Sequence, residues 1–383
     1  MCFTWEWDGK SIDPMVGDMP CAGGDTPSGN HELTVCTHVD DTVYGGSSDE
    51  VCDEFYRRMV RHFGECVGNT RAEFVLGLKV TWDLEKKTCT LSQRAHCEKI
   101  LKEFGMEPNE VRRTETPLPT GLKAEKNDGE RVPTQEFDYF GCVGSLNWLA
   151  VQTRPDLAGS VGMLGRYSQN PGPQHVGMAR HVLRYIATHL DEGLVYHGNA
   201  AELNASYHTV NKCMGYVDAD HGACKDTGRS TSGITIQLNG AAIIWSSRRQ
   251  KVKGTSTAHS EMIALDSMVK EMEWVRDMMA ELGFPQGCIR ILEDNNSTLR
   301  QATGDYKTGK SDHYRGLQLY VENAVREGKV WIDRVDTKDQ LADIHTKSVS
   351  PVQQFQLLRD RTHGKILYVP ISQTVRDILD GKR

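Results

Sequence analysis

The strongest constraint on the fold is the order of patterned segments in the second half of the chain. Residues 215–220 form a short apolar and aromatic run, and residues 233–238 alternate Ile or Leu with polar residues. An Asn-Gly pair, the strongest short hairpin signal, then leads into a third apolar run at 241–245. These segments predict three antiparallel strands.

A helix and two further strands are predicted after this hairpin. Apolar residues recur at spacings of three and four from Met262 to Leu282, and Gly283 supplies a helix stop signal. Short apolar runs then occur at 289–292 and 330–335. This order of elements predicts an α/β (α+β) domain in which helices flank a mixed five-stranded sheet.

Four acidic residues stand within or beside these elements. Asp218 lies in the first strand, Glu261 at the start of the helix, Asp294 at the end of the fourth strand, and Asp343 after the fifth. They are too far apart in sequence for a local metal-binding loop such as an EF-hand, so only a folded sheet can bring them together. Asp220 would lie on the same strand face as Asp218, and it is the alternative first ligand.

Four carboxylates at one point would repel one another and raise one another's pKa values unless cations neutralised them. Hard divalent ions with oxygen ligands suit such a group. Two of these ions, about 3.5–4 Å apart, are the standard device for cutting a phosphodiester. The pattern therefore predicts a site for divalent ions.

Six motifs surround these acids in a fixed order. They are Gly-Tyr-Val-Asp-Ala-Asp (215–220), Arg-Ser-Thr-Ser-Gly (229–233), Trp-Ser-Ser (245–247), Ser-Thr (256–257) leading to Glu261, Glu-Asp-Asn (293–295) and Asp-Gln-Leu-Ala-Asp-Ile-His-Thr-Lys (339–347). In this order they resemble the ribonuclease H domain of copia-type long-terminal-repeat retrotransposons. The resemblance implies the ribonuclease H-like fold.

The resemblance also implies metal-dependent hydrolysis of the RNA strand of an RNA–DNA hybrid. Asp218, Glu261, Asp294 and Asp343 would hold two Mg²⁺ or Mn²⁺ ions, one activating the attacking water and the other stabilising the leaving 3′-oxygen. The hybrid is the expected partner, and other Pol chains are further candidates.

Several departures from the family pattern favour an alternative, a catalytically inactive relic that binds nucleic acid without cleaving it. His38 replaces a usual Tyr, His221 replaces an aromatic residue, and the run 310–315 differs from the family's Lys-His-Ile-Asp type. A further departure, His259 in place of an acid, alters the wall of the site. His221, His259 and His345 are candidates for proton transfer, with ordinary surface histidines as the alternative interpretation.

The N-terminal part carries a second pair of acids. Two apolar arms around Asp40 and Asp41 predict a hairpin, and a helix at 49–63 and strands at 74–82 and 88–91 follow. This part resembles the C-terminal half of a copia-type reverse transcriptase. Polymerase activity is not expected, because a two-metal polymerase site needs a further carboxylate and no strand that could present one is evident upstream. The two aspartates are interpreted as vestigial.

The sequence predicts six segments. Residues 137–196 are mostly helical, and motifs such as Thr-Arg-Pro-Asp (153–156) resemble the family's connection between polymerase and ribonuclease H. The segments are an irregular N-terminus (1–31), a truncated reverse-transcriptase palm and thumb fragment (32–106), a linker (107–134), a helical connection (135–200), the ribonuclease H-like domain (213–361) and a tail (362–383).

A basic run joins the third predicted strand to the helix of Glu261. Its cations are Arg248, Arg249, Lys251 and Lys253. They are candidates for contact with the phosphates of a hybrid. The alternative is a solvated strand edge that charge protects from aggregation.

Composition limits the other classes of function. The chain has 383 residues, of which 38% are hydrophobic and 25% charged, as in soluble globular proteins. It contains no membrane-length apolar run and no signal pattern, so an intracellular protein without a membrane partner is expected. The net charge of −7 argues against bulk nonspecific adhesion to nucleic acid, which leaves local basic patches. The 11 cysteines form no Cys-x-x-Cys pair and are expected to be reduced.

Overall fold

The computed structural model describes residues 2–7, 31–39, 41–68, 71–107, 111–122, 124–206, 208–304 and 313–369. The chain forms two compact units. One contains residues 1–77 and 275–285, and the other contains residues 78–274 and 286–383. None of the described helices is long and apolar enough to cross a membrane.

The first unit contains a three-stranded antiparallel sheet. Its strands are β1 (Cys2–Trp7), β2 (His31–His38) and β3 (Asp41–Gly46), and helix α1 (Asp49–Phe63) and the short strand β4 (Phe74–Val75) follow. The predicted hairpin and the predicted helix at 49–63 are confirmed.

Two local predictions in this region are wrong. Cys2–Trp7 form a strand rather than irregular structure, because Phe3, Trp5 and Trp7 alternate with other residues at the period of a strand. The predicted strand 74–82 is interrupted, because Leu76 and Gly77 have φ values of 49° and 78° and turn the chain. The rest of the segment 1–31, apart from His31, lies outside the described residues.

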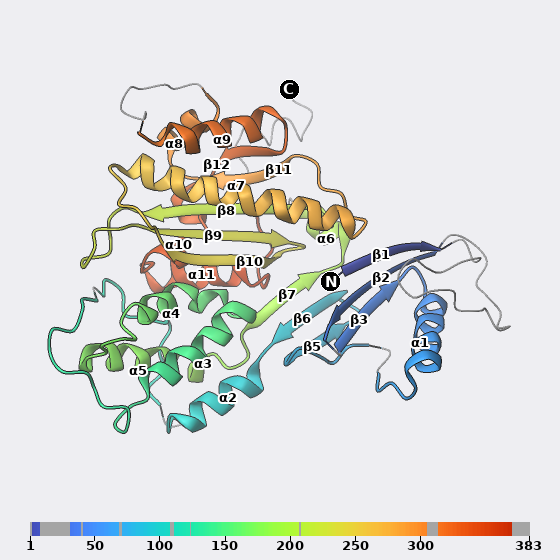
Figure 1. Cartoon of the computed structure of the whole chain (residues 1–383), viewed down its shortest axis with the longest axis horizontal. Helices are drawn as coiled ribbons and strands as arrows, with labels where there is room; N and C mark the ends of the chain where they lie inside the picture. Colours follow the sequence, from blue (N-terminus) through green and yellow to red (C-terminus); the bar gives the residue numbers. More distant parts are fainter. Residues whose placement is uncertain are drawn as a thin grey trace. The chain divides into compact units, whose positions relative to one another are not determined.

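The second unit is built on a mixed five-stranded sheet, in the order β10-β9-β8-β11-β12 (Figure 1). Strand β8 pairs antiparallel with β9, which pairs antiparallel with β10, whereas β11 runs parallel to both β8 and β12. The strands are β8 (Cys213–Asp220), β9 (Thr231–Leu238), β10 (Ala241–Arg249), β11 (Ile289–Glu293) and β12 (Val330–Arg334). The predicted sheet is confirmed.

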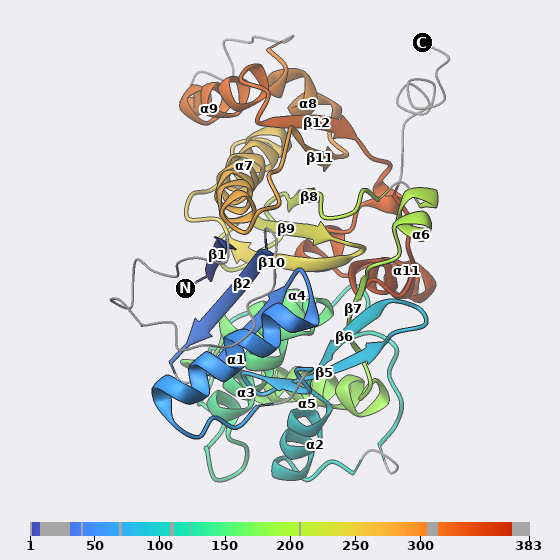
Figure 2. The same ribbon diagram turned by 90° about the vertical axis from the view of Figure 1, so that its right-hand side faces the viewer.

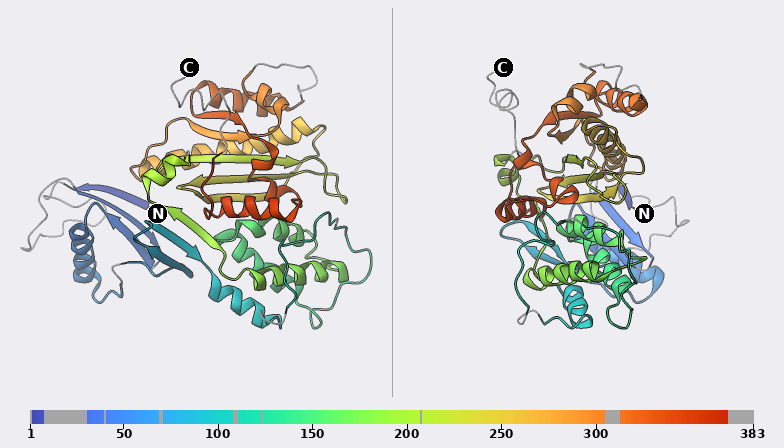
Figure 3. Two further views of the ribbon diagram at one scale, coloured as in Figure 1. Left: turned by 180° about the vertical axis from the view of Figure 1, so that it is seen from behind. Right: turned by 90° about the vertical axis from the view of Figure 1, so that its left-hand side faces the viewer.

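Helices cover both faces of this sheet. Helix α7 (Thr257–Glu281) lies on one face, and the short helix α10 (Asp343–Thr346) and helix α11 (Val352–Thr362) lie on the other (Figures 2 and 3). Gly215 allows α7 to approach closely, since a Cβ there would lie within 2.3 Å of the methyl groups of Met268 and Met272. Helices α8 (Asn296–Ala302) and α9 (Arg315–Arg326) connect β11 to β12.

The preceding part of this unit is mostly helical. It contains α2 (Arg94–Glu103), α3 (Tyr139–Gln152), the 3-10 turn η1 (Pro155–Leu157), α4 (Ala158–Gly165), α5 (Pro173–Thr188) and α6 (Ala200–Ala205). Strands β5 (Leu78–Asp83), β6 (Thr88–Ser92) and β7 (Gly193–His197) pair antiparallel. Strand β7 was not predicted, although Leu194-Val195-Tyr196 is a strand-favouring run.

One apolar core runs through the helices and into the sheet. It includes Leu146 and Leu183 from the helices and Tyr216 and Leu358 from the sheet and α11, all without exposed surface. The segment expected as a linker contributes Leu118, Ala124 and Val132 to the same core.

A buried ionic network also ties η1 to the end of α11. Arg154 and Asp156 are fully buried. The Arg154 guanidinium donates two hydrogen bonds to the Asp156 carboxylate, with N–O distances of 2.9 and 2.8 Å. The ring of His363 lies between Asp156 Oδ1, at 3.2 Å, and Glu192 Oε2, at 2.8 Å. Burial alone would lower the pKa of His363, but Asp156 and Glu192 outweigh burial and raise it.

The raised pKa of His363 predicts a stability that falls at alkaline pH. The protonated ring contributes stability that is fully present below the unfolded pKa of about 6.5 and is lost as pH rises through the higher folded pKa. We expect the free energy of unfolding, measured by urea denaturation between pH 6 and pH 9, to fall with pH. In His363→Gln this decrease should be smaller, and equal slopes in both proteins would contradict the assignment.

Candidate active site

Three of the four predicted acids meet at one edge of the five-stranded sheet. One carboxylate oxygen from each of Asp218, Glu261 and Asp294 lies within 4.8 Å of the other two. Asp218 and Glu261 are buried, with 3% and 4% of their surface exposed, and Asp294 is partly exposed. Among the described residues this is the one such group of acidic, His or Cys side chains.

Strand register explains why Asp218 and Asp294 meet. In the parallel pair β8 and β11, Leu292 stands opposite Tyr216. Asp218 and Asp294 each lie two residues beyond this pair, so both lie at the same level near the carboxyl ends of these parallel strands. Glu261 reaches the same edge from the second turn of α7, which begins four residues earlier than Glu261.

The fourth acid, Asp343, is brought to this edge by a close approach of backbones. Asp343 begins α10, which packs on β9. Gly233 stands opposite Asp218 in the β8–β9 pair, and a Cβ at this position would lie 2.7 Å from the carbonyl oxygen of Ala342. A glycine at 233 therefore lets α10 lie against the strand beside Asp218.

Asp343 is not one of the three clustered carboxylates, but it shares the Lys347 cation with Asp218. The Lys347 ammonium lies 2.8 Å from Asp343 Oδ1 and 3.8 Å from Asp218 Oδ2. The hydroxyl of Thr346 donates a hydrogen bond to the same oxygen of Asp218. Thr337 donates a hydrogen bond of 2.8 Å to Asp294 Oδ2. These contacts fix the carboxylates in place.

The acids disfavour one another's charged forms. Burial, followed by the charges of Glu293, Asp218 and Asp294, raises the pKa of Glu261. Burial and the Asp218 charge raise the pKa of Asp343 to about 8, although Lys347 opposes the increase. Burial raises the pKa of Asp218, again against Lys347. Positive charge beyond that of Lys347 would relieve this repulsion.

The donor set fits a hard divalent cation. All three clustered residues offer carboxylate oxygens, the ligands that Mg²⁺ and Mn²⁺ prefer. Glu261 Oε2 is buried and has no hydrogen-bond partner among the described residues. A bound metal ion would give this oxygen a partner. Asp218, Glu261 and Asp294 are therefore the residues that could hold the ion.

Two charged residues near the acids were not predicted. Glu293 has no exposed surface, and its pKa is raised well above the usual range by burial; one oxygen accepts a 2.9 Å hydrogen bond from the Asn295 amide. Lys347 ends the motif at residues 339–347, but the sequence assigned it no role in the site. Its position four residues after Asp343 was the available signal.

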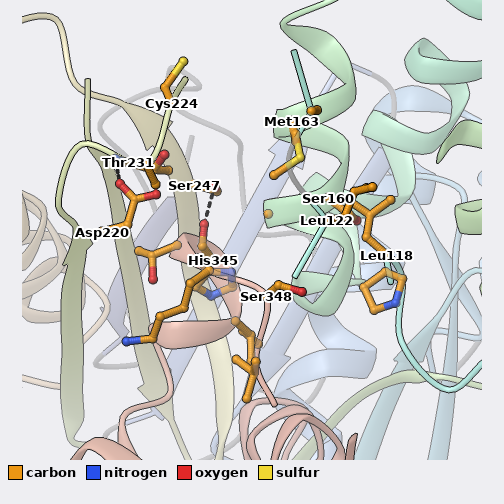
Figure 4. A pocket seen from close by; sticks show the side chains of 18 of the residues that line it. Leu118, Leu122, Ser160, Met163, Asp220, Cys224, Thr231, Ser247, His345 and Ser348 are labelled. Atoms are coloured by element: carbon orange, nitrogen blue, oxygen red, sulfur yellow. Dashed lines mark hydrogen bonds between the residues drawn. The ribbon is translucent and has the colours of Figure 1, made fainter. Parts of the chain in front are cut away.

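The alternative ligand, Asp220, lies outside the group. Its carboxylate accepts a hydrogen bond from the Thr231 amide, and burial raises its pKa to about 6. Asp220 lines a neighbouring cavity of about 440 Å³, together with Leu122 and Met163 (Figure 4). The geometry therefore favours Asp218 over Asp220.

The three candidate histidines have partners other than the acids. His221 Nδ1 lies 3.1 Å from Ser260 Oγ, and His259 Nδ1 lies 3.1 Å from Thr255 Oγ1. His345 is 1% exposed and bonded to Thr235, and burial lowers its pKa to about 3. His345 is thus a neutral core residue rather than a surface histidine.

The basic run is exposed beside the acids. Arg248 and Arg249 end β10, and Lys251 and Lys253 follow it. Between them, Gln250 donates a hydrogen bond of 2.8 Å to the carbonyl oxygen of Ser260, the residue before Glu261.

The second acid pair is only partly described. Asp41 is exposed at the start of β3, opposite His38, and belongs to no group of metal-ligand type among the described residues. Asp40 lies outside the described residues, as does the first half of the altered run 310–315.

A mixed sheet in this order, with acids at the ends of its first and fourth strands and on the intervening helix, defines the ribonuclease H-like class. The chain is 27% identical to a retrovirus-related Pol polyprotein from the tobacco transposon TNT 1-94 over 346 residues, 89% of this chain. It is 30% identical to the Pol polyprotein of transposon RE2 from Arabidopsis thaliana over 264 residues, 68% of this chain. The chain belongs to the retrovirus-related Pol polyproteins of copia-type transposons.

The match covers part of these relatives. The chain spans 25% of the tobacco protein's length and 17% of that of the Arabidopsis protein. A solved ribonuclease H1 isolated from compost aligns with 36% of this chain and 94% of its own, with 19% identity and a TM-score of 0.30. No protein-family model matches the sequence.

Proposed function

We propose that this chain hydrolyses the RNA strand of RNA–DNA hybrids in a reaction that depends on Mg²⁺ or Mn²⁺. The observation that carries the proposal is the convergence of Asp218, Glu261 and Asp294 within 4.8 Å on a ribonuclease H-like sheet. The relationship to Pol polyproteins supports a nucleic-acid substrate.

Each residue has a defined task in this proposal. Bound divalent ions would activate water and stabilise the leaving 3′-oxygen. Asp218, Glu261 and Asp294 would hold a first ion, and Thr346 and Thr337 orient two of these carboxylates. A second ion, which the sequence predicts, would need Asp218 and Asp343, the two acids that Lys347 contacts.

The basic run would hold the substrate. Arg248, Arg249, Lys251 and Lys253 are exposed and border the helix of Glu261, so they suit contacts with backbone phosphates. Recognition of the RNA strand would follow from the shape of the hybrid and from its 2′-hydroxyl groups.

A comparison of substrates tests this function. The purified chain is incubated with Mg²⁺ or Mn²⁺ and one labelled RNA strand, paired with either DNA or RNA, and with a DNA duplex of the same sequence. We expect cleavage of the RNA only in the hybrid. Binding of the hybrid without cleavage in either metal would favour the inactive relic instead.

Removal of the basic run should lower the affinity of the chain for the hybrid. It should also make this affinity less dependent on salt concentration. Replacing Arg248, Arg249 and Lys251 by Ala removes cations that release counterions from phosphates. Each lost contact should therefore reduce the slope of log affinity against log salt by roughly 0.7–0.9. Fluorescence anisotropy at several salt concentrations measures the slope. Arg131→Ala, which changes an exposed residue elsewhere in the second unit, is the control and should leave the slope unchanged. An unchanged slope in the triple variant would favour the interpretation of the run as a solvated strand edge.

A further inference from the structure

The acids at the sheet edge fall into two halves, and the second half faces the cation of Lys347. In the first half, one carboxylate oxygen from each of Asp218, Glu261 and Asp294 lies within 4.8 Å of the other two. In the second half, the oxygens of Asp218 and Asp343 face the Lys347 ammonium, at 3.8 and 2.8 Å. Asp218 belongs to both halves.

The second half differs from an ordinary helical ion pair. An exposed pair at this spacing on a helix contributes only about 0.3–0.5 kcal/mol. Here both carboxylates are buried, with 4% and 6% of their side-chain surface exposed, and they come from two different elements, β8 and α10. Lys347, whose side chain is 42% exposed, therefore places its ammonium against two buried acids.

A metal ion and this ammonium compete for the same oxygens. Mg²⁺ binds oxygen at about 2.0–2.1 Å, and the Lys347 nitrogen already lies 2.8 Å from Asp343 Oδ1. Asp218 Oδ2, the other oxygen that a second ion would use, also accepts the hydroxyl of Thr346. Two cations at these oxygens would repel each other strongly, because the acids are buried.

We propose that Lys347 takes the place of the second ion, so that the free chain binds one divalent ion, at Asp218, Glu261 and Asp294. A second ion can enter only after the ammonium of Lys347 moves away from Asp343. This inference rests on the proposed function, because it concerns the same site. In this proposal, Lys347 limits the number of divalent ions that the four acids bind.

Counting bound Mn²⁺ tests the proposal without nucleic acid. Electron paramagnetic resonance of free Mn²⁺ gives the number of ions bound by the full chain. We expect one ion per wild-type chain, two for Lys347→Met and Lys347→Gln, and one for Lys347→Arg, which keeps the cation. Lys338→Met, an exposed lysine near Thr337, should also bind one ion. Two ions on the wild-type chain, or one on folded Lys347→Met, would overturn the proposal.

Asp343→Asn provides a test that does not require the Lys347 variants to fold. Because Asp343 is not a ligand of the first ion in the proposal, the variant should still bind one ion at saturating Mn²⁺. Loss of that ion would overturn the proposal. In Lys347→Met, the added change Asp343→Asn should reduce the count from two to one. Cleavage is not measured, so failure of the nuclease proposal and failure of this one remain distinguishable.

Discussion

Replacing Asp294 by Asn is expected to lower the rate of hybrid cleavage by at least about 1,000-fold, which corresponds to roughly 4 kcal/mol in the activation barrier. A neutral amide is nearly the same size as the carboxylate but is a poorer ligand for Mg²⁺. Asp294 is partly exposed at the end of β11, so the fold should tolerate the change. Asp218→Asn should have the same effect. Single-turnover cleavage of a labelled hybrid measures the rate.

Controls separate loss of the site from loss of the fold. The variants should keep the circular dichroism spectrum of the wild-type chain. Asp336→Asn, an exposed acid in the loop after β12, should retain the wild-type rate. Undiminished cleavage by Asp294→Asn would show that the site has been assigned to the wrong residues.

Replacing Arg154 by Met is expected to destabilise the second unit by about 3–5 kcal/mol. Arg154 has no exposed surface and pairs with Asp156 through two hydrogen bonds, so its removal leaves a buried carboxylate without its main counter-charge. Urea denaturation measures the loss. The exposed Arg131, changed to Met in a parallel variant, should alter the free energy of unfolding by less than about 0.5 kcal/mol.

A double variant makes this prediction more specific. In Arg154→Met with Asp156→Leu, both charges are replaced by apolar groups, and the destabilisation should be smaller than in Arg154→Met alone. His363 would then lack one of its two carboxylate partners but keep Glu192. A loss below 1 kcal/mol for Arg154→Met would contradict a structural role for the network.

The sheet was predictable because its signals are local. Alternating residues define β9, and the Asn239-Gly240 turn, with φ values of 50° and 93°, fixes the hairpin to β10. The spacing of three and four residues from Met262 through Leu265 to Met268 and Met272 reflects burial of one face of α7. Each of these patterns reports a property of neighbouring residues in the chain.

The contacts between distant segments were not predictable. Nothing in the sequence around Lys347 indicates that its ammonium faces Asp218, because that contact depends on how α10 packs over Gly233. The burial of Arg154 between η1 and α11 likewise depends on tertiary packing, as does the pairing of β7 with β6. Such contacts arise only once the chain is folded.

The most direct test of the central claim is the chemistry of the cleavage products. A hybrid with an end-labelled RNA strand is incubated with the purified chain and Mg²⁺, and the ends of the fragments are identified. Attack by water with departure of the 3′-oxygen predicts fragments with 5′-phosphate and 3′-hydroxyl ends, and no products when a chelator is present. Intact RNA in both Mg²⁺ and Mn²⁺, or fragments with 2′,3′-cyclic phosphate ends, would contradict the account.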